Sequence, residues 1–354
     1  MTRQYRIAVV PGDGIGHEII PAGSQVLDVV AKRFGFEVSK ETFPYGAGYY
    51  KETGWFLPPD GLDILRQFDA IYFGAVGLPD VDDTLPAKLF TFNIRKNFDQ
   101  YVNYRPARLL NGIKSPLRAA PPRDIDFIVI RENTEGEFVQ VGGFVQPETS
   151  AGFAMDTSVF TRVGIERIAH YSFRLAQRRR RKVTNITKSN TLIYSLAYWD
   201  GVIEEIRRSY PDVTYDKMYV DNASANFVLH PERFDVIVTT NFIGDILSDL
   251  GGALMGSLGL GASGNINPEK AYPSMFEPIH GSAPDIAGKG IANPIGAIWS
   301  AALMLEHLGE KPAADVVVKA IENTVAEGTL PVDLGGSATT SQIADRVCAN
   351  VQAL

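Results

Sequence analysis

The sequence contains a single cysteine, Cys348, among 354 residues. A single thiol excludes an internal disulfide framework and suits a reducing compartment. The five histidines match no metal-ligand spacing, so a zinc site built from cysteine and histidine is also excluded. No serine in a nucleophile-elbow motif accompanies them, and hydrolytic triad chemistry is therefore not expected.

Long apolar runs are also missing. The longest, 291–305, is broken by Asn293 and Pro294, and the apolar core near the N-terminus is too short for a signal peptide. With 45% hydrophobic and 21% charged residues and a net charge of −7, the composition is that of an ordinary globular protein with two domains or two lobes. We expect a cytoplasmic protein with no membrane partner.

One basic run, Arg178–Lys182, suggests nucleic-acid binding. It follows a helical pattern that ends at Gln177, where cations complement the helix dipole, and the chain as a whole is acidic. We therefore expect no nucleic-acid partner.

Short β-branched runs alternate with amphipathic helical patterns, which predicts an α/β fold with crossover connections. The expected strands are 7–10, 36–43, 70–74, 101–108, 127–131, 182–186, 214–220 and 236–240. The expected helices are 15–34, 158–177, 192–209, 246–254, 295–307, 313–326 and 341–352. Residues 138–156, rich in Gly, Val and Phe, break the alternation and predict an extended β arm. Because such an arm can exchange between subunits, we expect a homodimer.

Two acidic residues stand out in the apolar stretch 241–250. Asp245 and Asp249 lie four residues apart, so a helix would place both carboxylates on one face. Ile246, Leu247 and Leu250 leave little polar surface around them, and buried like charges need a cation. A hard divalent ion such as Mg2+ or Mn2+ takes oxygen ligands, whereas the alternative is a solvated acidic face. The stretch predicts a metal site.

Two glycine motifs resemble dinucleotide-binding loops. Residues 259–264 match GxGxxG, but they do not open a helix, and no acidic residue follows at the distance expected for a ribose contact. Residues 11–16 lie between a strand and a helix, yet their glycine spacing is wrong, which predicts a tight turn. The fold is therefore not expected to be a Rossmann fold.

Three arginines lie in similar strand-edge contexts: Arg95 in NIRK, Arg105 in YRP and Arg131 in VIREN. Guanidinium groups bind carboxylates through two parallel hydrogen bonds, so a cluster of three would suit a dicarboxylic acid. Taken singly, each arginine fits a surface cation better, and the reason for grouping them is the resemblance described next.

Nearly the whole chain resembles the metal-dependent β-decarboxylating dehydrogenases, the isopropylmalate and isocitrate dehydrogenase family. The matching segments are Val10–Gly16 (VPGDGIG), Gly74–Gly77 (GAVG), Arg131–Gly136 (RENTEG), Thr187–Asn190 (TKSN), Asn241–Leu250 and Phe276–Gly288 (FEPIHGSAPDIAG). Phe98–Asn103 (FDQYVN) and Ala225–Asp235 (ANFVLHPERFD) are most similar to the tartrate/D-malate dehydrogenase branch.

The resemblance implies an isopropylmalate dehydrogenase-like, two-lobed α/β fold. A central mixed sheet is flanked by helices, and the β arm 138–156 serves dimerisation. Residues 1–99 and 253–354 would form the cofactor-binding lobe, and residues 100–252 the lobe for substrate, metal and dimerisation.

The resemblance also implies the roles of the polar residues. Arg95, Arg105 and Arg131 would bind the substrate carboxylates, with Asn190 nearby, and Asp221, Asp245 and Asp249 would hold Mg2+ or Mn2+. Lys188 would accept the hydroxyl proton, assisted by Asp221. Lys188 and Asp221 would enter each site from the other subunit of the homodimer.

The cofactor is expected to be NAD. The resemblance implies that it binds along residues 277–293, through Glu277, His280, Gly281, Ser282, Ala283, Asp285 and Asn293. A carboxylate at Asp285 can accept hydrogen bonds from a ribose 2′-hydroxyl but repels a 2′-phosphate, and no Lys-Tyr pair replaces it here. NAD is therefore favoured over NADP.

The chain departs from the family at Phe138, where the family carries a tyrosine that donates a proton in the later steps. Either decarboxylation is inefficient here, or water or Lys188 donates the proton. If residues 88–95 are helical, Lys88, Thr91 and Phe92 share a face with Arg95 and meet the C3 substituent of the substrate. Lys88 permits a further polar group there, unless it is solvated.

Together these features predict an NAD-dependent, metal-dependent oxidation of (2R)-malate or a 3-substituted malate to a 2-keto acid, with or without β-decarboxylation. The alternatives are a 3-isopropylmalate dehydrogenase or a non-catalytic regulatory homologue that keeps only the fold.

Overall fold

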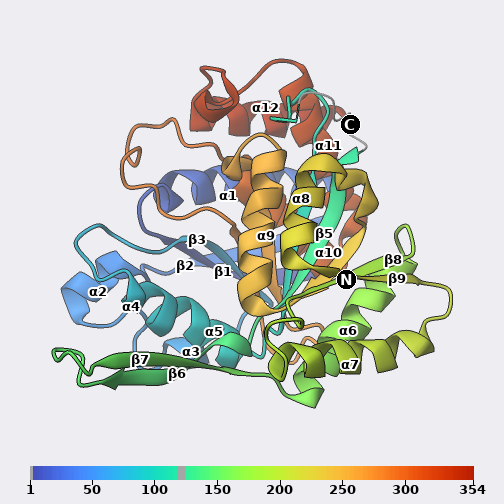
Figure 1. The fold of residues 1–354 in the computed structure, drawn as a ribbon. Coiled ribbons are helices and arrows are strands. Elements are labelled where there is room, and N and C mark those ends of the chain that lie inside the picture. Colours follow the sequence, from blue (N-terminus) through green and yellow to red (C-terminus); the bar gives the residue numbers. More distant parts are fainter. Residues whose placement is uncertain (1–2, 118–123) are drawn as a thin grey trace.

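The computed structural model describes residues 3–117 and 124–354. Within these residues one central sheet contains ten strands in the order β2-β1-β3-β12-β11-β4-β5-β10-β8-β9 (Figure 1). The strands are β1 Arg3–Gly12, β2 Phe36–Thr42, β3 Ala70–Ala75, β4 Val102–Arg108, β5 Asp126–Glu132, β8 Lys182–Thr187, β9 Thr214–Tyr219, β10 Val236–Thr239, β11 Ala262–Ile266 and β12 Ser274–Pro278. Strands β11, β4 and β5 pair antiparallel in the middle and β12 is antiparallel to β11, while the outer pairs are parallel. The sheet is therefore mixed, as predicted.

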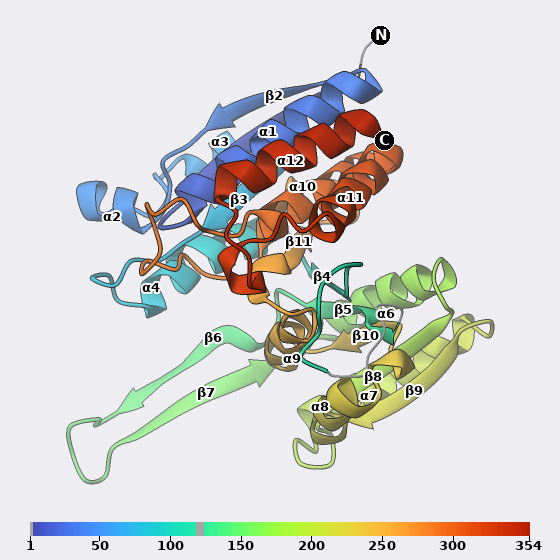
Figure 2. The same cartoon turned by 90° about the horizontal axis from the view of Figure 1, so that it is seen from above.

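Helices cover the sheet on both faces (Figures 1 and 2). They are α1 Gly16–Phe34, α2 Ala47–Thr53, α3 Gly61–Leu65, α4 Thr84–Pro86, α5 Phe92–Asn97, α6 Arg162–Gln177, α7 Ser195–Ile206, α8 Val220–Leu229, α9 Asn241–Leu254, α10 Ile295–Leu308, α11 Lys311–Ala326 and α12 Thr340–Ala353. A π-helical turn, Ala87–Thr91, leads into α5. Helix α1 shows why the ends fall where they do, because Gly35 adopts the left-handed φ of 70° that ends it and glycine takes this conformation without strain.

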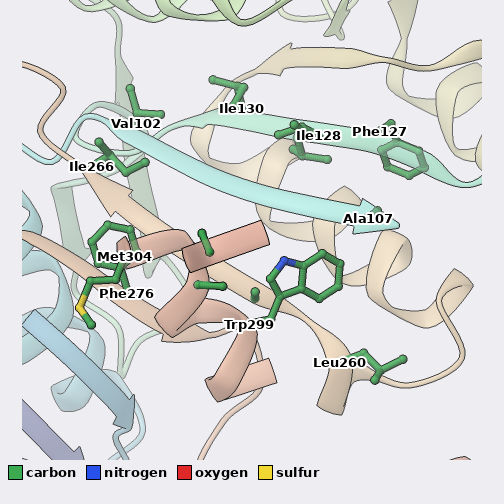
Figure 3. Packing of buried hydrophobic residues seen from close by; sticks show 14 of the residues in the cluster. Val102, Ala107, Phe127, Ile128, Ile130, Leu260, Ile266, Phe276, Trp299 and Met304 are labelled. Carbon is green, nitrogen blue, oxygen red and sulfur yellow. The ribbon is translucent and has the colours of Figure 1, made fainter. Parts of the chain in front are cut away.

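The hydrophobic core lies between the middle strands and α10 (Figure 3). Ala297, Ala301 and Ala302 are buried on α10, and small side chains let the helix approach the strands closely. Phe276 on β12 is completely buried, with its ring centroid 5.6 Å from that of His307 on α10. Phe127 on β5 is also completely buried, but it packs against Phe227 of α8, at 4.8 Å between ring centroids. This packing fixes the strand ends from which the polar side chains of the candidate site emerge.

Strands β6 (Gly136–Val145) and β7 (Phe153–Val159) form a separate antiparallel hairpin that projects from the body of the chain (Figure 2). The predicted arm is thus present. Six of its large apolar side chains are exposed: Val141, Phe144, Val145, Phe153, Met155 and Val159. Exposed apolar patches of this kind mark interaction surfaces.

Some predicted boundaries were wrong. Residues 158 and 159 belong to β7, so α6 begins at Arg162, and α9 begins at Asn241 instead of residue 246. Strands β11 and β12 and helix α8 were missed. The two strands have few β-branched residues, ASGNI and SMFEP, and are held by burial between neighbours, which overrides propensity.

The basic run has a structural role. Arg179 Nε donates to Asp235 Oδ1 at 2.8 Å, and the backbone N–H of Arg180 donates to Asp235 Oδ2 at 2.9 Å. Asp235 is buried, so these cations neutralise an interior carboxylate just after α6. Among the described residues, no helix combines the length and apolar character needed to cross a membrane.

Candidate active site

Helix α9 places Asp245 and Asp249 one turn apart beside Arg105. Arg105 Nη1 lies 3.4 Å from Asp245 Oδ1 and 3.5 Å from Asp249 Oδ1, and Arg131 Nη1 also pairs with Asp245 Oδ1. The shared face predicted from the spacing is confirmed. The prediction that this face of α9 is buried is wrong for a single copy of the chain. The Asp245 and Asp249 side chains are 43% and 54% exposed, and Ile246 is 55% exposed.

The two carboxylates differ in electrostatic environment. Burial alone would raise the pKa of Asp245, but the charges of Arg131, Arg105 and Arg95 outweigh it and hold that pKa below its usual value. The pKa of Asp249 is raised by burial and by the neighbouring Asp245, against the attraction of Arg105. Burial lowers the pKa of Arg131, and Asp245 opposes that shift. Once Asp245 is ionised, a negative charge on Asp249 is thus disfavoured unless a cation other than the arginines is present.

Arg105 and Arg131 come from the paired strands β4 and β5. Arg105 lies opposite Val129, and Arg131 is two residues further along β5, so the two arginines are diagonal neighbours on one face of the sheet. Arg105 Nη1 donates to Ser248 Oγ at 2.7 Å, and Arg131 Nε donates to Asn241 Oδ1 at 2.7 Å. Both guanidinium groups are therefore fixed by strand pairing and by α9.

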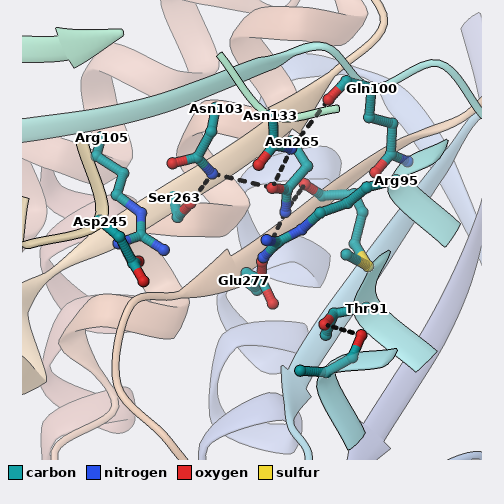
Figure 4. A network of polar contacts seen from close by, with 12 residues as sticks. Thr91, Arg95, Gln100, Asn103, Arg105, Asn133, Asp245, Ser263, Asn265 and Glu277 are labelled. Carbon is teal, nitrogen blue, oxygen red and sulfur yellow. Dashed lines mark hydrogen bonds and ion pairs between the residues drawn. The ribbon is translucent and has the colours of Figure 1, made fainter. Parts of the chain in front are cut away.

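Arg95 reaches the same region from α5. Its Nη2 donates to Glu277 Oε1 on β12 at 2.8 Å, and both side chains are 8% exposed (Figure 4). The Nε atoms of Arg95 and Arg105 are buried and have no hydrogen-bond partner within the described residues. Buried guanidinium donors without partners are what an anionic ligand would satisfy.

Phe138 on β6 lies against this cluster. The Arg131 guanidinium carbon is 5.6 Å from its ring centroid, and the rings of Phe92 and Phe242 lie 5.8 Å and 6.0 Å away. The position predicted to differ from the family thus contacts a predicted substrate arginine.

Lys88, Thr91 and Phe92 were expected to share a helical face with Arg95, and only part of this prediction is correct. Phe92 contacts Arg95, with the guanidinium carbon 5.8 Å from the ring centroid. The π-helical turn over 87–91 changes the angular spacing of the preceding residues, so the assumed α-helical face does not extend to Lys88. Lys88 is exposed, and the Thr91 hydroxyl donates to the Ala87 carbonyl at 3.1 Å.

Lys188 and Asp221 form their own pair, with Lys188 Nζ 2.6 Å from Asp221 Oδ1. The hydrogen bond from Lys188 lowers the pKa of Asp221. Both side chains are solvent-accessible, and Asn190 beside them is exposed. Within the described part of one chain, no three His, Cys, Asp or Glu side chains are placed to hold a metal ion. One chain therefore brings Asp245 and Asp249 together but not Asp221 with them.

The segment predicted to bind the cofactor packs on the turn after β1. Ile15 N donates to the Ser282 carbonyl at 2.8 Å, and Ser282 Oγ donates to the Gly77 carbonyl at 2.7 Å. Gly14 has φ 56°, and a Cβ there would lie 2.0 Å from the Ser282 oxygen, so glycine is required. The predicted tight turn is confirmed, and it positions residues 281–283.

His280, Asp285 and Asn293 surround this segment. Burial lowers the pKa of His280; its Nδ1 contacts the Gly281 carbonyl at 3.0 Å, while Nε2 is buried without a partner in the described structure. Nδ1 is therefore assigned as the donor and Nε2 as a free acceptor. Asp285 is exposed, and Asn293 Nδ2 donates to Asp333 Oδ2 at 3.0 Å.

Sequence reasoning missed two groups of side chains near the arginines. Asn241 and Ser248 bond Arg131 and Arg105 directly. Asn103 and Asn133 bond Asn265, and Asn265 bonds Glu277. Their signal was polar residues in or next to buried strands and along α9. The match of residues 259–264 to a nucleotide-binding pattern hides the start of β11, the strand that carries Asn265.

The chain is similar in sequence and fold to known dehydrogenases. A family model described as isocitrate/isopropylmalate dehydrogenase matches residues 6–347. A probable tartrate dehydrogenase/decarboxylase of Agrobacterium vitis is 50% identical over 98% of this chain and 97% of its own. The D-malate dehydrogenase [decarboxylating] of Escherichia coli (strain K12) is 48% identical over 98% and 99%. A crystal structure of isocitrate dehydrogenase from Methylococcus capsulatus has a TM-score of 0.89 at 35% identity, covering 98% of this chain and 99% of the other.

Proposed function

Because the chain belongs to the isocitrate/isopropylmalate dehydrogenase family, we propose that it oxidises (2R)-malate or a 3-substituted malate such as tartrate with NAD and a divalent metal. The product is a 2-keto acid, and the names of the relatives support β-decarboxylation as a following step. The observation that carries the proposal is one partly exposed cluster of ion pairs. It contains Arg105, Arg131, Asp245 and Asp249.

The arginines bind the substrate carboxylates in this proposal. Arg105 and Arg131 share Asp245 as a counter-ion, and Arg95 is held by Glu277 nearby. Within residues 3–117 and 124–354 the buried Nε donors of Arg95 and Arg105 have no hydrogen-bond partner, which supports binding of an anion. Phe92 and Phe138 form an apolar wall beside the arginines, which orients a small substrate.

Asp245 and Asp249 suit a hard divalent ion in charge and donor type, because they are adjacent carboxylates. A bound cation would offset the burial and the Asp245 charge that raise the pKa of Asp249. Asp221 of a second copy would complete the ligand set. Bound there, Mg2+ or Mn2+ would polarise the substrate hydroxyl and the resulting ketone.

Lys188, as the neutral amine, would accept the proton of the substrate hydroxyl. NAD, when bound, would supply the acceptor for the hydride of C2. The hydrogen bond from Lys188 to Asp221 holds the Nζ atom in a fixed place on the same chain. When CO2 leaves, the electrons of the broken C–C bond form an enolate. A proton donor protonates this enolate at C3.

The dinucleotide lies along residues 277–293 in this proposal. Three features support it: the unpartnered His280 Nε2, the exposed carboxylate of Asp285, and the close packing of Ser282 on the Gly14 turn. Asp285 favours the ribose hydroxyls of NAD over the phosphate of NADP. Asn293, engaged with Asp333, would contact the adenine with its remaining hydrogen.

A homodimer with shared sites explains why Lys188 and Asp221 stand apart from the arginines within one chain. Exposed apolar side chains on the arm, and Tyr194, Leu229 and Ile246 on the same lobe, would be covered by the second copy. Five sheet strands come from 1–99 and 253–354 and five from 100–252, which supports the two proposed lobes.

The direct test is a substrate panel. Purified protein with NAD and Mn2+ is assayed for NADH with (2R)-malate, (2S)-malate, the tartrate isomers, 3-isopropylmalate and isocitrate. We expect (2R)-malate or a tartrate to give the highest kcat/KM, and Arg131→Gln to abolish it while Arg346→Gln, a surface arginine on α12, does not. Preference for 3-isopropylmalate or isocitrate would contradict the proposal.

A further inference from the structure

A group of buried amide side chains lies in the middle of the central sheet, beside Arg95 (Figure 4). Asn265 on β11 is at its centre and is completely buried. Asn265 Oδ1 accepts hydrogen bonds from Asn103 Nδ2 on β4 at 2.9 Å and from Asn133 Nδ2, just after β5, at 3.0 Å. Asn265 Nδ2 donates to Glu277 Oε1 on β12 at 2.6 Å.

These contacts connect all three arginines. Asn103 is two residues before Arg105, and Asn133 is two residues after Arg131. The same Glu277 Oε1 atom accepts a hydrogen bond from Arg95 Nη2 at 2.8 Å. A single carboxamide therefore bonds to both segments that carry Arg105 and Arg131 and to the carboxylate that holds Arg95.

The orientation of the Asn265 amide is determined by its partners. Turning it over would place its NH2 group against two other NH2 groups and its oxygen against a carboxylate. Because the site is buried, such mismatched contacts are not relieved by water. Asn265 therefore acts as a donor toward Glu277 and as an acceptor toward Asn103 and Asn133.

Arg95 depends on this group more than the other two arginines do. Arg105 and Arg131 are fixed by the pairing of β4 with β5 and by contacts with α9. Arg95 lies on the six-residue helix α5, and its Nε has no partner in the described residues. Its guanidinium is directed by Glu277, whose accepting oxygen is in turn held by Asn265.

We propose that Asn265 is a positioning residue for substrate binding. It holds Glu277, and through it Arg95, at the place where Arg95 can bind a dicarboxylate together with Arg105 and Arg131. The inference rests on the proposed function, since it assigns Asn265 to the affinity of that same site.

The decisive variant is Asn265→Asp, which is nearly isosteric. It replaces the donor with a carboxylate that faces Glu277, so one of the two acids must take up a proton or the contact separates. The charged groups that face position 265 are Glu277 of β12 and Arg95 of α5, whereas Asn103 and Asn133 are neutral. Protonation of the introduced carboxyl group would restore both the donor and the acceptor, so low pH should rescue the variant.

The loss of affinity and its rescue at low pH are measured by steady-state kinetics with NAD, Mn2+ and the preferred substrate of the panel. At about pH 8 we expect Asn265→Asp to lower kcat/KM by about 10- to 100-fold, mainly through KM, because a misplacement near 1 Å can cost about 100-fold. The ratio of its KM to that of the unchanged enzyme should fall toward one as the pH decreases to about 6. Asn265→Ala should raise KM at every pH without this rescue.

Asn350→Asp is the matched control. Asn350 is also buried and donates to a glutamate, Glu327, at 3.3 Å, but it lies on α12. The KM of Asn350→Asp should equal that of the unchanged enzyme at every pH.

If Asn265→Asp and Asn265→Ala fold, as judged by circular dichroism, and keep an unchanged KM, the positioning role is refuted while the proposed function stands. If the unchanged enzyme oxidises none of the substrates, the proposed function fails and this role with it. Should Asn265→Asp not fold, Asn265→Ala decides.

Discussion

Phe138 offers the sharpest prediction about chemistry, because one hydroxyl group can be added at a defined place. The ring lies beside Arg131 and between Phe92 and Phe242, and it is partly exposed. Phe138→Tyr would place a phenol next to the predicted substrate carboxylates. We expect this phenol to donate its proton to the enolate as CO2 leaves, so that decarboxylation itself becomes faster.

The magnitude follows from the neighbouring charge. A phenolate at the 5.6 Å separation of the Phe138 ring and Arg131 would gain about 3 kcal/mol at an effective dielectric constant of about 20. The negative charge of Asp245 opposes this gain, so the figure of about 3 kcal/mol is an upper bound. The pKa of the introduced phenol should therefore lie below its usual value, which makes it a better acid. A positioned general acid contributes about 10²–10⁴-fold to a proton-transfer step.

The assay follows NADH and CO2 in parallel with the preferred substrate. In the unchanged enzyme we expect NADH to appear faster than CO2, or a keto acid to accumulate, and we expect Phe138→Tyr to raise the ratio of CO2 to NADH. Phe144→Tyr, on the exposed part of the same arm, is the control and should leave the ratio unchanged. Stoichiometric CO2 release by the unchanged enzyme, with no effect of Phe138→Tyr, would show that water or Lys188 donates the proton and that Phe138 only packs.

Three further predictions concern the metal, the coenzyme and pH. Asp245→Asn should weaken Mn2+ binding, measured by calorimetry, by at least about 10- to 100-fold, whereas Asp345→Asn on α12 should not; equal binding would remove Asp245 from the ligand set. NAD should exceed NADP by about 100-fold in kcat/KM, and Asp285→Ser should reduce that preference; equal use of both coenzymes by the unchanged enzyme would contradict the role of Asp285. Burial lowers the pKa of His307 from 6.5 to about 4, so its contribution to stability is present above pH 6.5 and is lost as the pH falls toward 4. The loss is about 2 kcal/mol at about pH 5. The free energy of unfolding of His307→Asn should therefore fall less between about pH 7 and pH 5, and an equal slope in both proteins would contradict this.

The sequence predicted well those elements whose pattern depends on burial alone. Continuous apolar runs such as 70–74 and 236–240 became buried parallel strands, and the Asp245–Asp249 spacing placed both carboxylates on one helical face. These features are local, since the side-chain period of a helix or strand follows directly from its geometry.

Features that depend on several elements at once were not predictable. The π-helical turn at 87–91 changes which residues share a face with Arg95, and no residue type marks it. Asn265 becomes important only because β11 is placed between β12 and β4. The exposure of Ile246 in one chain likewise depends on what covers α9, which a single sequence does not state.

The central claim is that each site combines Arg131, Asp245 and Asp249 of one chain with Lys188 and Asp221 of another. Lys188→Ala and Arg131→Ala, each inactive alone, are mixed in equal amounts under conditions of verified subunit exchange, and NADH formation is measured. Half of the dimers are then mixed and each has one complete site of two, so the account predicts recovery of about one quarter of the unchanged activity. No recovery after confirmed exchange would place Lys188 in the site of its own chain and contradict the account.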